Sequence, residues 1–302
     1  MRLSLRLPRL IACASLLATC AAAGAAVLEI NQTCAVTGGC LPGDTGGFPV
    51  TISQPGEYRL TSNLSVKNLP TPENVTAIQV DAADVDLDFN GFGLFGATTC
   101  SGFPTTCLPV GSGYGVLATK PGTAVHDGSV AGFGAAGLAL DDGLRVERMR
   151  LWNNGREGLR SYSSGGILTD SMVFANGGDG AHTYRYTVVT GSTFVANNAN
   201  GFYGDQYSAV EESISWGNGR RGYQSDVSLS AHFSVANGNR TSGIGGAAYG
   251  CVAANNVLYG VTTAVFTYDT VILQSVLTGN SAGPWLSGNV SLGQNACNGS
   301  AC

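Results

Sequence analysis

Residues 176–222, NGGDGAHTYRYTVVTGSTFVANNANGFYGDQYSAVEESISWGNGRRG, hold three copies of one pattern: an asparagine followed four residues later by a glycine. The copies Asn176–Gly180, Asn197–Gly201 and Asn218–Gly222 begin 21 residues apart. So constant a period indicates one supersecondary unit stacked on itself. Outward from this stretch, the glycine recurs every 21 or 22 residues at Gly115, Gly137, Gly158, Gly180, Gly201, Gly222 and Gly243.

Apolar residues share this period, and their spacing indicates short strands. The residue after each repeat glycine is usually apolar, as in Val116, Leu138 and Phe202, and two further apolar columns stand twelve and seven residues before the next glycine. About three strands with turns fill a repeat of this length, and no segment carries a helical apolar stripe. We therefore expect a solenoid of parallel strands, with coils about 4.8 Å apart and asparagines stacked in a turn.

Two stretches resemble the right-handed parallel β-helix proteins of the pectate-lyase-like superfamily: VTGSTFVANNANG at Val189–Gly201 and DVDLDFNG at Asp84–Gly91. The resemblance covers roughly residues 57–292, or about eleven coils at this period. It implies an all-β, single-stranded, right-handed parallel β-helix. The superfamily includes polysaccharide lyases, glycoside hydrolases, esterases, epimerases, adhesins and phage tailspikes. No subfamily catalytic motif is recognisable, so the resemblance implies a fold without a single activity.

Segments outside the repeat predict the rest of the organisation. Residues 1–26 have a basic start, the apolar run Leu10–Leu17 and small residues before Val27, the order of a secretory signal peptide. A lipid anchor on Cys20 is the alternative. We expect a protein exported to the periplasm or the exterior. Residues 27–56 are expected to cap the N-terminal end, 90–113 to form a loop insertion in the helix of 57–292, and 293–302 to form a C-terminal disulfide cap.

Six cysteines form the close pairs Cys34/Cys40, Cys100/Cys107 and Cys297/Cys302. In an exported chain each pair is expected to be a local disulfide, with reduced thiols as the alternative. Cys251 is left over. It stands nine residues before Gly260, where other repeats carry serine, so we expect a buried small residue and not a nucleophile.

Composition and charge exclude some classes of partner. The chain has 15 basic and 20 acidic residues, and removing three signal-peptide arginines leaves 12 against 20, a net charge of −8. A nucleic-acid-binding protein is expected to carry a basic footprint, so nucleic acid is an unexpected partner. No later segment is long and apolar enough to be a membrane span. Oligomeric state has no signal in the sequence.

Polar and aromatic residues gather on one expected face. The second and fourth residues after each repeat glycine should point outward from adjacent coils. These pairs are Ala139/Asp141, Arg160/Tyr162, His182/Tyr184, Tyr203/Asp205 and Gln224/Asp226, with Arg185 in the adjoining turn. From Asp141 to Asp226 the face should extend about 19 Å, enough for several sugar rings. The alternative is an ordinary solvated strand face, because tyrosine is a good strand former.

His182 is the best candidate for a general base or acid. Arg160 could neutralise a substrate carboxylate, and Tyr184 or Tyr203 could donate a proton, which suits β-elimination in a uronic-acid polymer. Asp205 and Asp226 stand at equivalent positions on adjacent coils and would instead suit a glycoside hydrolase. Asp141, Tyr162, Arg185, Tyr203 and Gln224 are the expected substrate-binding residues of this face.

Two further groups are candidates for binding. Asp84, Asp86 and Asp88 alternate onto one strand face and could hold Ca²⁺, although such a row is more often simply solvated. No other cofactor is expected. Trp152, Phe174 and Trp216 share one column, and the two tryptophans bind sugar or a partner if that column faces outward; with the opposite strand parity they are core residues.

Two functions therefore remain open. The first is a secreted protein that binds an extracellular polysaccharide and, as a lyase or glycoside hydrolase, cleaves it. The second is a non-catalytic surface, adhesion or interaction protein that uses the solenoid as a rigid scaffold. Whether the protein is an enzyme stays undecided at this point.

Overall fold

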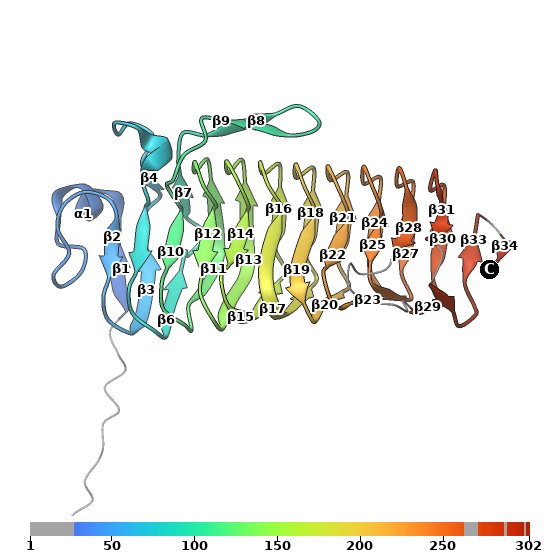
Figure 1. The fold of residues 1–302 in the computed structure, drawn as a ribbon. Coiled ribbons are helices and arrows are strands. Elements are labelled where there is room, and N and C mark those ends of the chain that lie inside the picture. The colour runs from blue at the N-terminus through green and yellow to red at the C-terminus, as the bar shows by residue number, and fades with distance from the viewer. Residues whose placement is uncertain (1–26, 263–270, 287–288, 299) are drawn as a thin grey trace, which may run out of the picture.

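The computed structural model describes residues 27–262, 271–286, 289–298 and 300–302, and it is a right-handed parallel β-helix (Figure 1). The chain winds through three sheets, and each strand pairs in parallel with its counterpart in the next coil. The expected fold class is thus confirmed. The signal-peptide prediction falls on residues 1–26, outside the described residues. Among the described residues, neither helix is long and apolar enough to span a membrane.

The strands are assigned to sheets by their pairing. Sheet 1 contains β2 (Val50–Ile52), β5 (Ile78–Val80), β10 (Val116–Ala118), β12 (Leu138–Leu140), β14 (Leu159–Ser161), β17 (Ala181–Thr190), β19 (Phe202–Gln206), β22 (Tyr223–Ser225), β25 (Ile244–Gly245), β28 (Tyr259–Thr262) and β31 (Gly283–Trp285). Sheet 2 contains β1 (Leu28–Ile30), β3 (Gly56–Leu60), β6 (Val85–Asp88), β11 (Ala124–Ala131), β13 (Leu144–Trp152), β15 (Ser164–Thr169), the continuing β17, β20 (Ser208–Glu211), β23 (Leu229–His232), β26 (Ala247–Tyr249), β29 (Val271–Leu273) and β32 (Val290–Ser291). Sheet 3 contains β4 (Leu64–Ser65), β7 (Gly93–Phe95), the ends of β11 and β13, β16 (Met172–Phe174), β18 (Thr193–Val195), β21 (Ile214–Trp216), β24 (Val235–Asn237), β27 (Val252–Ala254), β30 (Val276–Thr278) and β33 (Ala296–Cys297), with β34 (Ser300–Ala301) antiparallel to β33.

The regular part of the solenoid has about eight turns, from β10 to β28. This is fewer than the eleven expected, because the coils at the two ends depart from the repeat length. Between β5 and β10 the chain makes a long excursion, and after β28 it passes through residues 263–270, which lie outside the described residues.

The core lies inside the three sheets and is built from the apolar columns of the repeat. Val116, Leu138 and Phe202 in sheet 1 are fully buried, as are Val189 in sheet 2 and Val173 in sheet 3. Equivalent side chains stack directly from coil to coil because the register pairs residues one repeat apart.

A buried ladder of asparagines fills the turn from sheet 3 to sheet 1. Asn176 Nδ2 donates to Asn197 Oδ1 at 2.9 Å, and Asn197 Nδ2 donates to Asn218 Oδ1 at 3.0 Å. The same oxygens accept the backbone N–H of the preceding rung at 3.0–3.1 Å. Each side chain thereby satisfies main-chain groups that the sharp turn removes from the sheets. The ladder is made of Asn154, Asn176, Asn197, Asn218, Asn239, Asn256 and Asn280.

Between Asp127 and Gln274, each described corner from sheet 2 to sheet 3 turns on a single left-handed residue. Asp127, Arg148 and Asp170 have φ of 60°, 49° and 48°. One left-handed residue bends an extended chain sharply without breaking the register on either side. Charged side chains on this column are therefore held at fixed positions along the edge of the solenoid.

Three disulfides join the predicted cysteine pairs, so that expectation is confirmed: Cys34–Cys40, Cys100–Cys107 and Cys297–Cys302. Cys34–Cys40 ties down α1 (Gln32–Thr37), whose Ala35 is buried, at the N-terminal end. The 3-10 helix η1 (Pro72–Asn74) lies in the excursion before β10. Cys251 is buried, as expected, and is the one thiol outside a disulfide among the described residues.

Cys297–Cys302 closes the last element of the chain. Cys297 ends β33, and β34 pairs with β33 in the antiparallel direction, so the bond joins the two sides of a short terminal hairpin. Cys302 itself is exposed, and its backbone N–H donates to the Asn295 carbonyl at 3.2 Å. The bond therefore holds a hairpin at the C-terminal end of the solenoid, far along the chain from the polar face of sheet 1.

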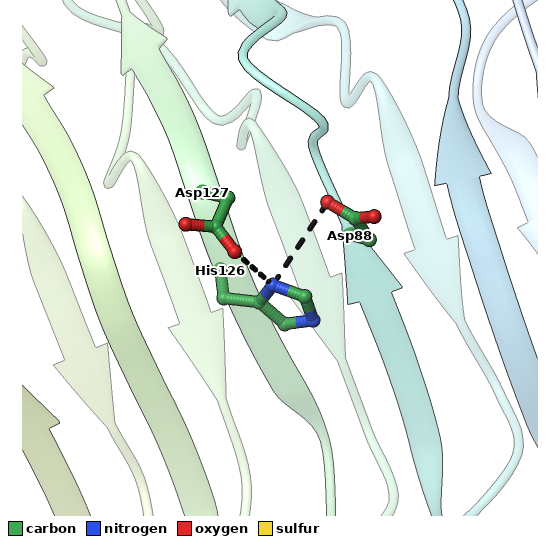
Figure 2. A group of neighbouring side chains, drawn as sticks. All are labelled: Asp88, His126 and Asp127. Atoms are coloured by element: carbon green, nitrogen blue, oxygen red, sulfur yellow. Dashed lines mark hydrogen bonds and ion pairs between the residues drawn. The ribbon is translucent and has the colours of Figure 1, made fainter.

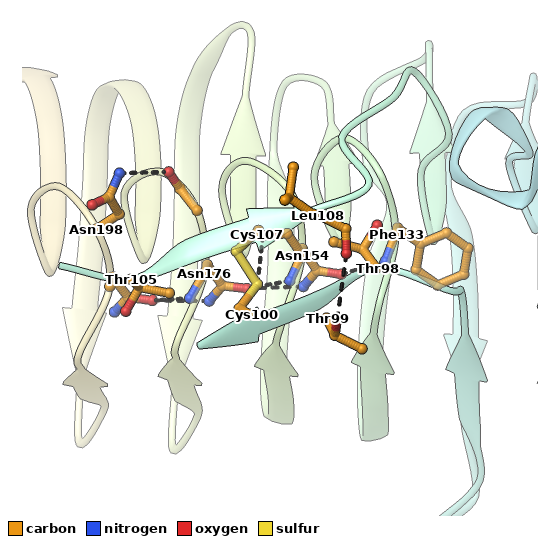
Figure 3. The surroundings of a disulfide bond; sticks show 12 residues. Thr98, Thr99, Cys100, Thr105, Cys107, Leu108, Phe133, Asn154, Asn176 and Asn198 are labelled. Carbon is orange, nitrogen blue, oxygen red and sulfur yellow. Dashed lines mark hydrogen bonds between the residues drawn. A yellow bond between two sulfur atoms is a disulfide. The ribbon is translucent and has the colours of Figure 1, made fainter. Parts of the chain in front are cut away.

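A hairpin of β8 (Thr99–Ser101) and β9 (Thr106–Leu108) extends along the top of the solenoid (Figure 1). Cys100 and Cys107 face each other across it, and their disulfide lies over the asparagine ladder (Figure 3). Cys107 is 5% exposed, and Cys100 Sγ is 3.8 Å from the Asn154 carbonyl oxygen. Near the tip, Thr105 Oγ1 donates to the Ala196 carbonyl at 2.5 Å. The hairpin is thus packed down across several coils.

Candidate functional site

The outward column of sheet 1 brings together residues that are far apart in sequence. The register pairs Arg160 with His182, His182 with Tyr203, and Tyr203 with Gln224. Inward neighbours such as Phe202 are fully buried, and His182 and Tyr203 are partly exposed. Their side chains therefore stand on adjacent coils of one face, as the period predicts.

His182 lies between two carboxylates. Its Nε2 is 3.1 Å from Asp205 Oδ1, and its Nδ1 is 3.7 Å from Asp179 Oδ2. The ring of Tyr203 packs against the imidazole with centroids 4.6 Å apart. The His182 side chain is 23% exposed, so it is supported by the protein yet reachable from outside. We call His182, Asp179, Tyr203 and Asp205 the His182 centre.

Asp179 is the most enclosed member of the centre. Its side chain is 12% exposed, and its Oδ1 accepts hydrogen bonds from the backbone N–H and the side-chain amide of Asn200 at 2.7 and 2.9 Å. Burial raises the pKa of the Asp179 carboxyl, although the Asn200 donors and His182 oppose the rise. The outward strand positions of the repeat did not include Asp179, because this residue directly precedes a repeat glycine.

Tyr203 is a phenol held in its protonated form. Burial, and then the neighbouring carboxylate of Asp226, raise the pKa of Tyr203 well above its ordinary value. The hydroxyl therefore stays protonated at neutral pH. Asp205 and Asp226 consequently serve different partners, the imidazole of His182 and the phenol of Tyr203. This arrangement differs from two free carboxylates facing a glycosidic bond.

Arg160 is already engaged by a carboxylate. Its Nη1 donates to Glu157 Oε1 at 3.1 Å, and its guanidinium lies over the ring of Tyr162 at 5.2 Å. Tyr162 and Tyr114 have hydroxyls 3.4 Å apart, and burial together with this contact raises the pKa of Tyr162 to about 12. Glu157, another residue that the sequence analysis missed, also precedes a repeat glycine.

Aromatic side chains continue the face toward the corner with sheet 2. The Arg185 guanidinium lies 4.8 Å from the centroid of the Tyr184 ring. Tyr186 and Tyr207 stack with centroids 5.5 Å apart and planes 10° from parallel, and both are exposed. Flat exposed rings of this kind suit sugar stacking.

A groove of about 430 Å³ adjoins the His182 centre, since Asp179 and Tyr203 line both. Arg221 and Gln224 also line the groove. Gln224 is 6% exposed, and its side chain contacts Arg221, so this expected surface residue is a buried one. It is buried because the side chain folds back against Arg221 of the preceding turn. Asp141 accepts a hydrogen bond from the Asp142 backbone N–H at 2.9 Å and has no contact with the centre among the described residues.

The tryptophan column faces outward on sheet 3, which resolves its strand parity. Leu151 and Val173 are fully buried, and their neighbours Trp152 and Phe174 are partly exposed. Trp152 and Phe174 stack with centroids 5.6 Å apart. Trp216 is 55% exposed. These residues and the His182 centre belong to different sheets and do not form one site.

The disulfide cysteines lie apart from the His182 centre. Cys107 lies in β9 of the hairpin and is buried against the turn from sheet 3 to sheet 1, and Cys302 is exposed at the C-terminal end. Neither lines the groove next to the centre. Their role is therefore structural, and neither contributes a group to the candidate chemistry.

A second charged cluster lies on sheet 2 around His126 (Figure 2). His126 Nδ1 is 2.7 Å from Asp127 Oδ2 and 3.9 Å from Asp88 Oδ1, and Nε2 is 2.7 Å from Asp86 Oδ1. Burial lowers the pKa of His126, but these carboxylates outweigh it and the net pKa is raised. His126 and Asp86 are 40 residues apart in the sequence, and the pairing of β11 with β6 brings them together.

The fit of this cluster to a cation is limited by neighbouring arginines. Ligand atoms of Asp88, His126 and Asp127 lie within 4.8 Å of one another. However, Arg148 binds both oxygens of Asp127 at 2.6 and 2.7 Å, and Arg59 donates to Asp88 at 2.9 Å. The cluster is therefore an ion-pair network. Binding of Ca²⁺ by Asp84, Asp86 and Asp88 stays a prediction. Asp84 forms no ion pair among the described residues.

Comparison with known proteins agrees with the fold. No protein-family model and no curated protein matches the chain. Among solved structures, pectate lyase Pel9A is similar with a TM-score of 0.51 and 16% identity, over 80% of this chain and 71% of that one. The A-module of the Azotobacter vinelandii mannuronan C-5 epimerase AlgE4 has a TM-score of 0.49 and 11% identity, over 78% and 91%. A mutant of the periplasmic alginate epimerase AlgG has a TM-score of 0.49 and 12% identity, over 87% and 81%. The similarity to the pectate lyase concerns the fold, which is the one that the sequence resemblance implied.

Proposed function

We propose that this protein is exported, binds a polysaccharide along the outward face of sheet 1, and cleaves it with the His182 centre. The observation that carries the proposal is the position of His182 between Asp205 and Asp179, with Tyr203 against its ring. The three disulfides support an oxidising compartment. Pectate lyase Pel9A, which shares the fold, is named for action on a polysaccharide.

The geometry favours proton transfer at His182. Asp205 holds Nε2 and fixes the orientation of the ring. Nδ1 has no hydrogen bond among the described residues, and Asp179 is near enough to stabilise the imidazolium that forms when Nδ1 takes a proton. The protonated phenol of Tyr203 can give a proton to a leaving oxygen. An acid and a base on adjacent coils are what β-elimination requires: the base removes the proton next to the sugar's electron-withdrawing group, the glycosidic C–O bond breaks, and the leaving oxygen is protonated.

Glycoside hydrolysis through Asp205 and Asp226 is the less favoured version. Each carboxylate already has a partner, so neither is free to act as an unassisted nucleophile. A retaining pair would also have to face one glycosidic bond from two sides.

The test is a panel of soluble polysaccharides, read both for retention on the immobilised protein and for cleavage. We expect at least one polymer to be retained and its chains to shorten, with an unsaturated sugar end detected by ultraviolet absorbance. Tyr203→Ala, which removes a ring from the face, should weaken retention, and Arg240→Ala, near the hairpin tip, should not. A panel in which no polymer is retained contradicts the proposal.

Exposed aromatic pairs favour a second candidate, a non-catalytic binding protein. Tyr186 stacks on Tyr207, Phe233 packs edge-on against Tyr249, and all but Tyr249 are more than half exposed. Such rings suit a partner surface as well as a sugar. This candidate predicts retention without cleavage, unchanged by His182→Ala, or recovery of a protein partner with no glycan retained.

A further inference from the structure

The groove beside the His182 centre holds arginine charge that the protein does not neutralise. Besides Asp179 and Tyr203 it is lined by Ala199, Asn200, Arg220, Arg221, Gln224, Thr241, Ser242 and Leu258. Its volume of about 430 Å³ lies in the range of roughly 300–1,000 Å³ typical of small-molecule sites. We propose, resting on the proposed function, that this groove binds an anionic substituent of the polysaccharide, and that Arg221 is its principal partner.

Arg221 is partly buried without an ion-pair partner. Within the described ranges, no carboxylate lies within 4 Å of its guanidinium, which instead contacts the neutral amide oxygen of Gln224. Its backbone N–H donates to Asn200 Oδ1 at 3.1 Å, so the start of the side chain is fixed. A cation held away from water is costly unless it is paired. Burial accordingly lowers the pKa of Arg221, and the charge of Asp226 opposes this shift more weakly. A bound carboxylate or sulfate would supply the missing partner.

Arg160 contrasts with Arg221 on the same side of the solenoid. Glu157 binds the Arg160 guanidinium at 3.1 Å, so that arginine is already neutralised. From the sequence, we expected Arg160 to bind a substrate carboxylate. The contacts transfer that role to Arg221, with the exposed Arg220 at the rim adding long-range attraction.

The groove is placed to act on the same sugar chain as the His182 centre. Arg221 precedes β22 and His182 lies in β17, two coils away, which is on the order of 10 Å along the solenoid. Tyr203 lies on the coil between them, packs against His182 and lines the groove that holds Arg221. An anion on Arg221 therefore belongs to a sugar unit next to the reacting one, and it sets the position of the chain on the face. Substrates with charged sugars should be preferred over neutral ones.

Paired polymers test this inference. Polygalacturonate offers carboxylates and its methyl-esterified form does not; dextran sulfate offers sulfates and dextran does not. We expect wild-type protein to bind at least one anionic polymer and to bind its neutral counterpart at least tenfold more weakly. Arg221→Gln should weaken that binding by about tenfold to a hundredfold, the loss expected for a charge-assisted contact. The binding should also weaken as salt is raised.

Control variants separate this effect from misfolding. Arg240→Gln removes a positive charge that lies over the Phe103 ring and does not line the groove, and it should leave binding unchanged. Arg220→Gln alters an exposed side chain at the rim and should weaken binding severalfold without affecting the fold. If Arg221→Gln fails to fold, Arg221→Lys keeps the charge but loses the planar fork, and should show an intermediate loss of affinity.

The outcomes distinguish the inference from the proposed function. Retention of neutral polymers as strongly as anionic ones, or anionic binding that survives Arg221→Gln, overturns the inference and leaves the proposed function standing. Absence of binding to every polymer overturns the proposed function, and the inference with it. Whether polygalacturonate or dextran sulfate is retained identifies the anionic group.

Discussion

At the scale of single residues, the candidate chemistry depends on how the protein surrounds one imidazole. Asp205 orients His182 through Nε2, and Asp179 faces Nδ1 from a nearly enclosed position. The two carboxylates differ in environment, because Asp179 is held by the amides of Asn200 and is shielded from water. Groups with environments that differ in this way are typical of sites that move protons.

His182→Ala tests the centre directly. Because the side chain is outward and contributes little to the core, the variant should fold normally. If the protein cleaves a polysaccharide, the rate should fall by about 10²–10⁴-fold, the usual loss on removing a general acid or base. Turnover on the polymer found by the panel measures this. Full activity in His182→Ala would remove the proposed base, and an unfolded variant would mean that the imidazole holds the fold.

Asp179→Asn should stabilise the fold at neutral pH. The pKa of Asp179 is raised in the folded state by burial, so the folded protein disfavours the ionised form. The Asp179 carboxyl contributes fully to the free energy of unfolding below about pH 3.9, the pKa of an aspartate in the unfolded chain. This contribution is lost as the pH rises through the higher pKa of Asp179 in the folded protein. The advantage of Asp179→Asn over wild type should therefore be small near pH 4, grow as pH rises, and level off.

Urea unfolding at several pH values measures that trend. Asp142→Asn, at an exposed carboxylate, should change the free energy of unfolding by less than about 0.5 kcal/mol. An Asp179→Asn variant that is less stable than wild type at pH 7 would show that the carboxylate stabilises the fold. Activity should fall in the same variant, because the charge facing Nδ1 is lost.

At the scale of elements, the asparagine ladder decides how sheet 3 turns into sheet 1. Each rung uses one oxygen to accept two donors from the rung before it, and one amide to reach the next rung and a carbonyl. These groups are fully buried, so water cannot replace them. Asparagine is required because a single side chain must offer both an acceptor and a donor pair.

Asn197→Ala should cost about 2–5 kcal/mol, because it leaves two donors of Asn176 and one carbonyl without partners in a dry turn. Asn198→Ala is the matched control next to it. Asn198 is exposed and makes one side-chain bond, at 3.2 Å to the Gly177 carbonyl, so its loss should cost less than about 1 kcal/mol. Urea denaturation measures both, and equal losses would contradict a structural role of the ladder.

The repeat predicts the strands well and the close cysteine pairs predict the disulfides, but the sequence predicts only part of the candidate site. Period and alternation identify which residues share a column, and the columns that hold His182 and Tyr203 are paired as expected. Asp179 and Arg221 also share a column, directly before the repeat glycine, and could have been found there. The repeat period does not determine side-chain rotamers. The contact of the Gln224 side chain with Arg221 could therefore not be predicted from the sequence.

The His126 cluster had no signal for a different reason. Its strands β6 and β11 are separated by the excursion that carries the hairpin, so the register between them does not follow the repeat length. Asp86 and His126 meet because the chain returns after that excursion. Contacts across an insertion depend on where the chain re-enters the stack, which periodicity does not encode.

At the scale of the whole molecule, one inward column of the core becomes thinner in the later coils. In sheet 3 the register places Leu94 and Leu151 in this column in the early coils, and Ala236 and Ala253 in later ones. Burial stabilises in proportion to apolar area, at about 25 cal/mol per Å². In a solenoid each coil contacts its neighbours alone, so stability is a sum of local terms and can differ between the two ends.

Cys251 can report this difference, because it lies in the thin part of the core. It continues a column of serines that begins several coils earlier, in the series Ser171, Ser192, Ser213, Ser234, Cys251. Its thiol is 1% exposed and lies 3.2 Å from the Ala231 carbonyl oxygen, and burial raises its pKa. A thiol reagent can therefore reach it after local opening and not in the closed state.

Pulsed thiol labelling in increasing urea should modify Cys251 before the N-terminal coils open. Ser171→Cys supplies a matched thiol in the same column, and mass spectrometry after digestion assigns the label to each site within one molecule. We expect the labelling midpoint of Cys251 to fall at lower urea than that of the cysteine at position 171, since the sheet 3 column next to Cys251 holds the small side chains of Ala236 and Ala253 and buries less apolar area there. Cys251→Ser, in the same background, should leave the labelling of position 171 unchanged. Coincident midpoints for the two thiols would mean that the solenoid opens as one cooperative unit, and that the apolar difference between its ends is compensated by the continuous asparagine ladder.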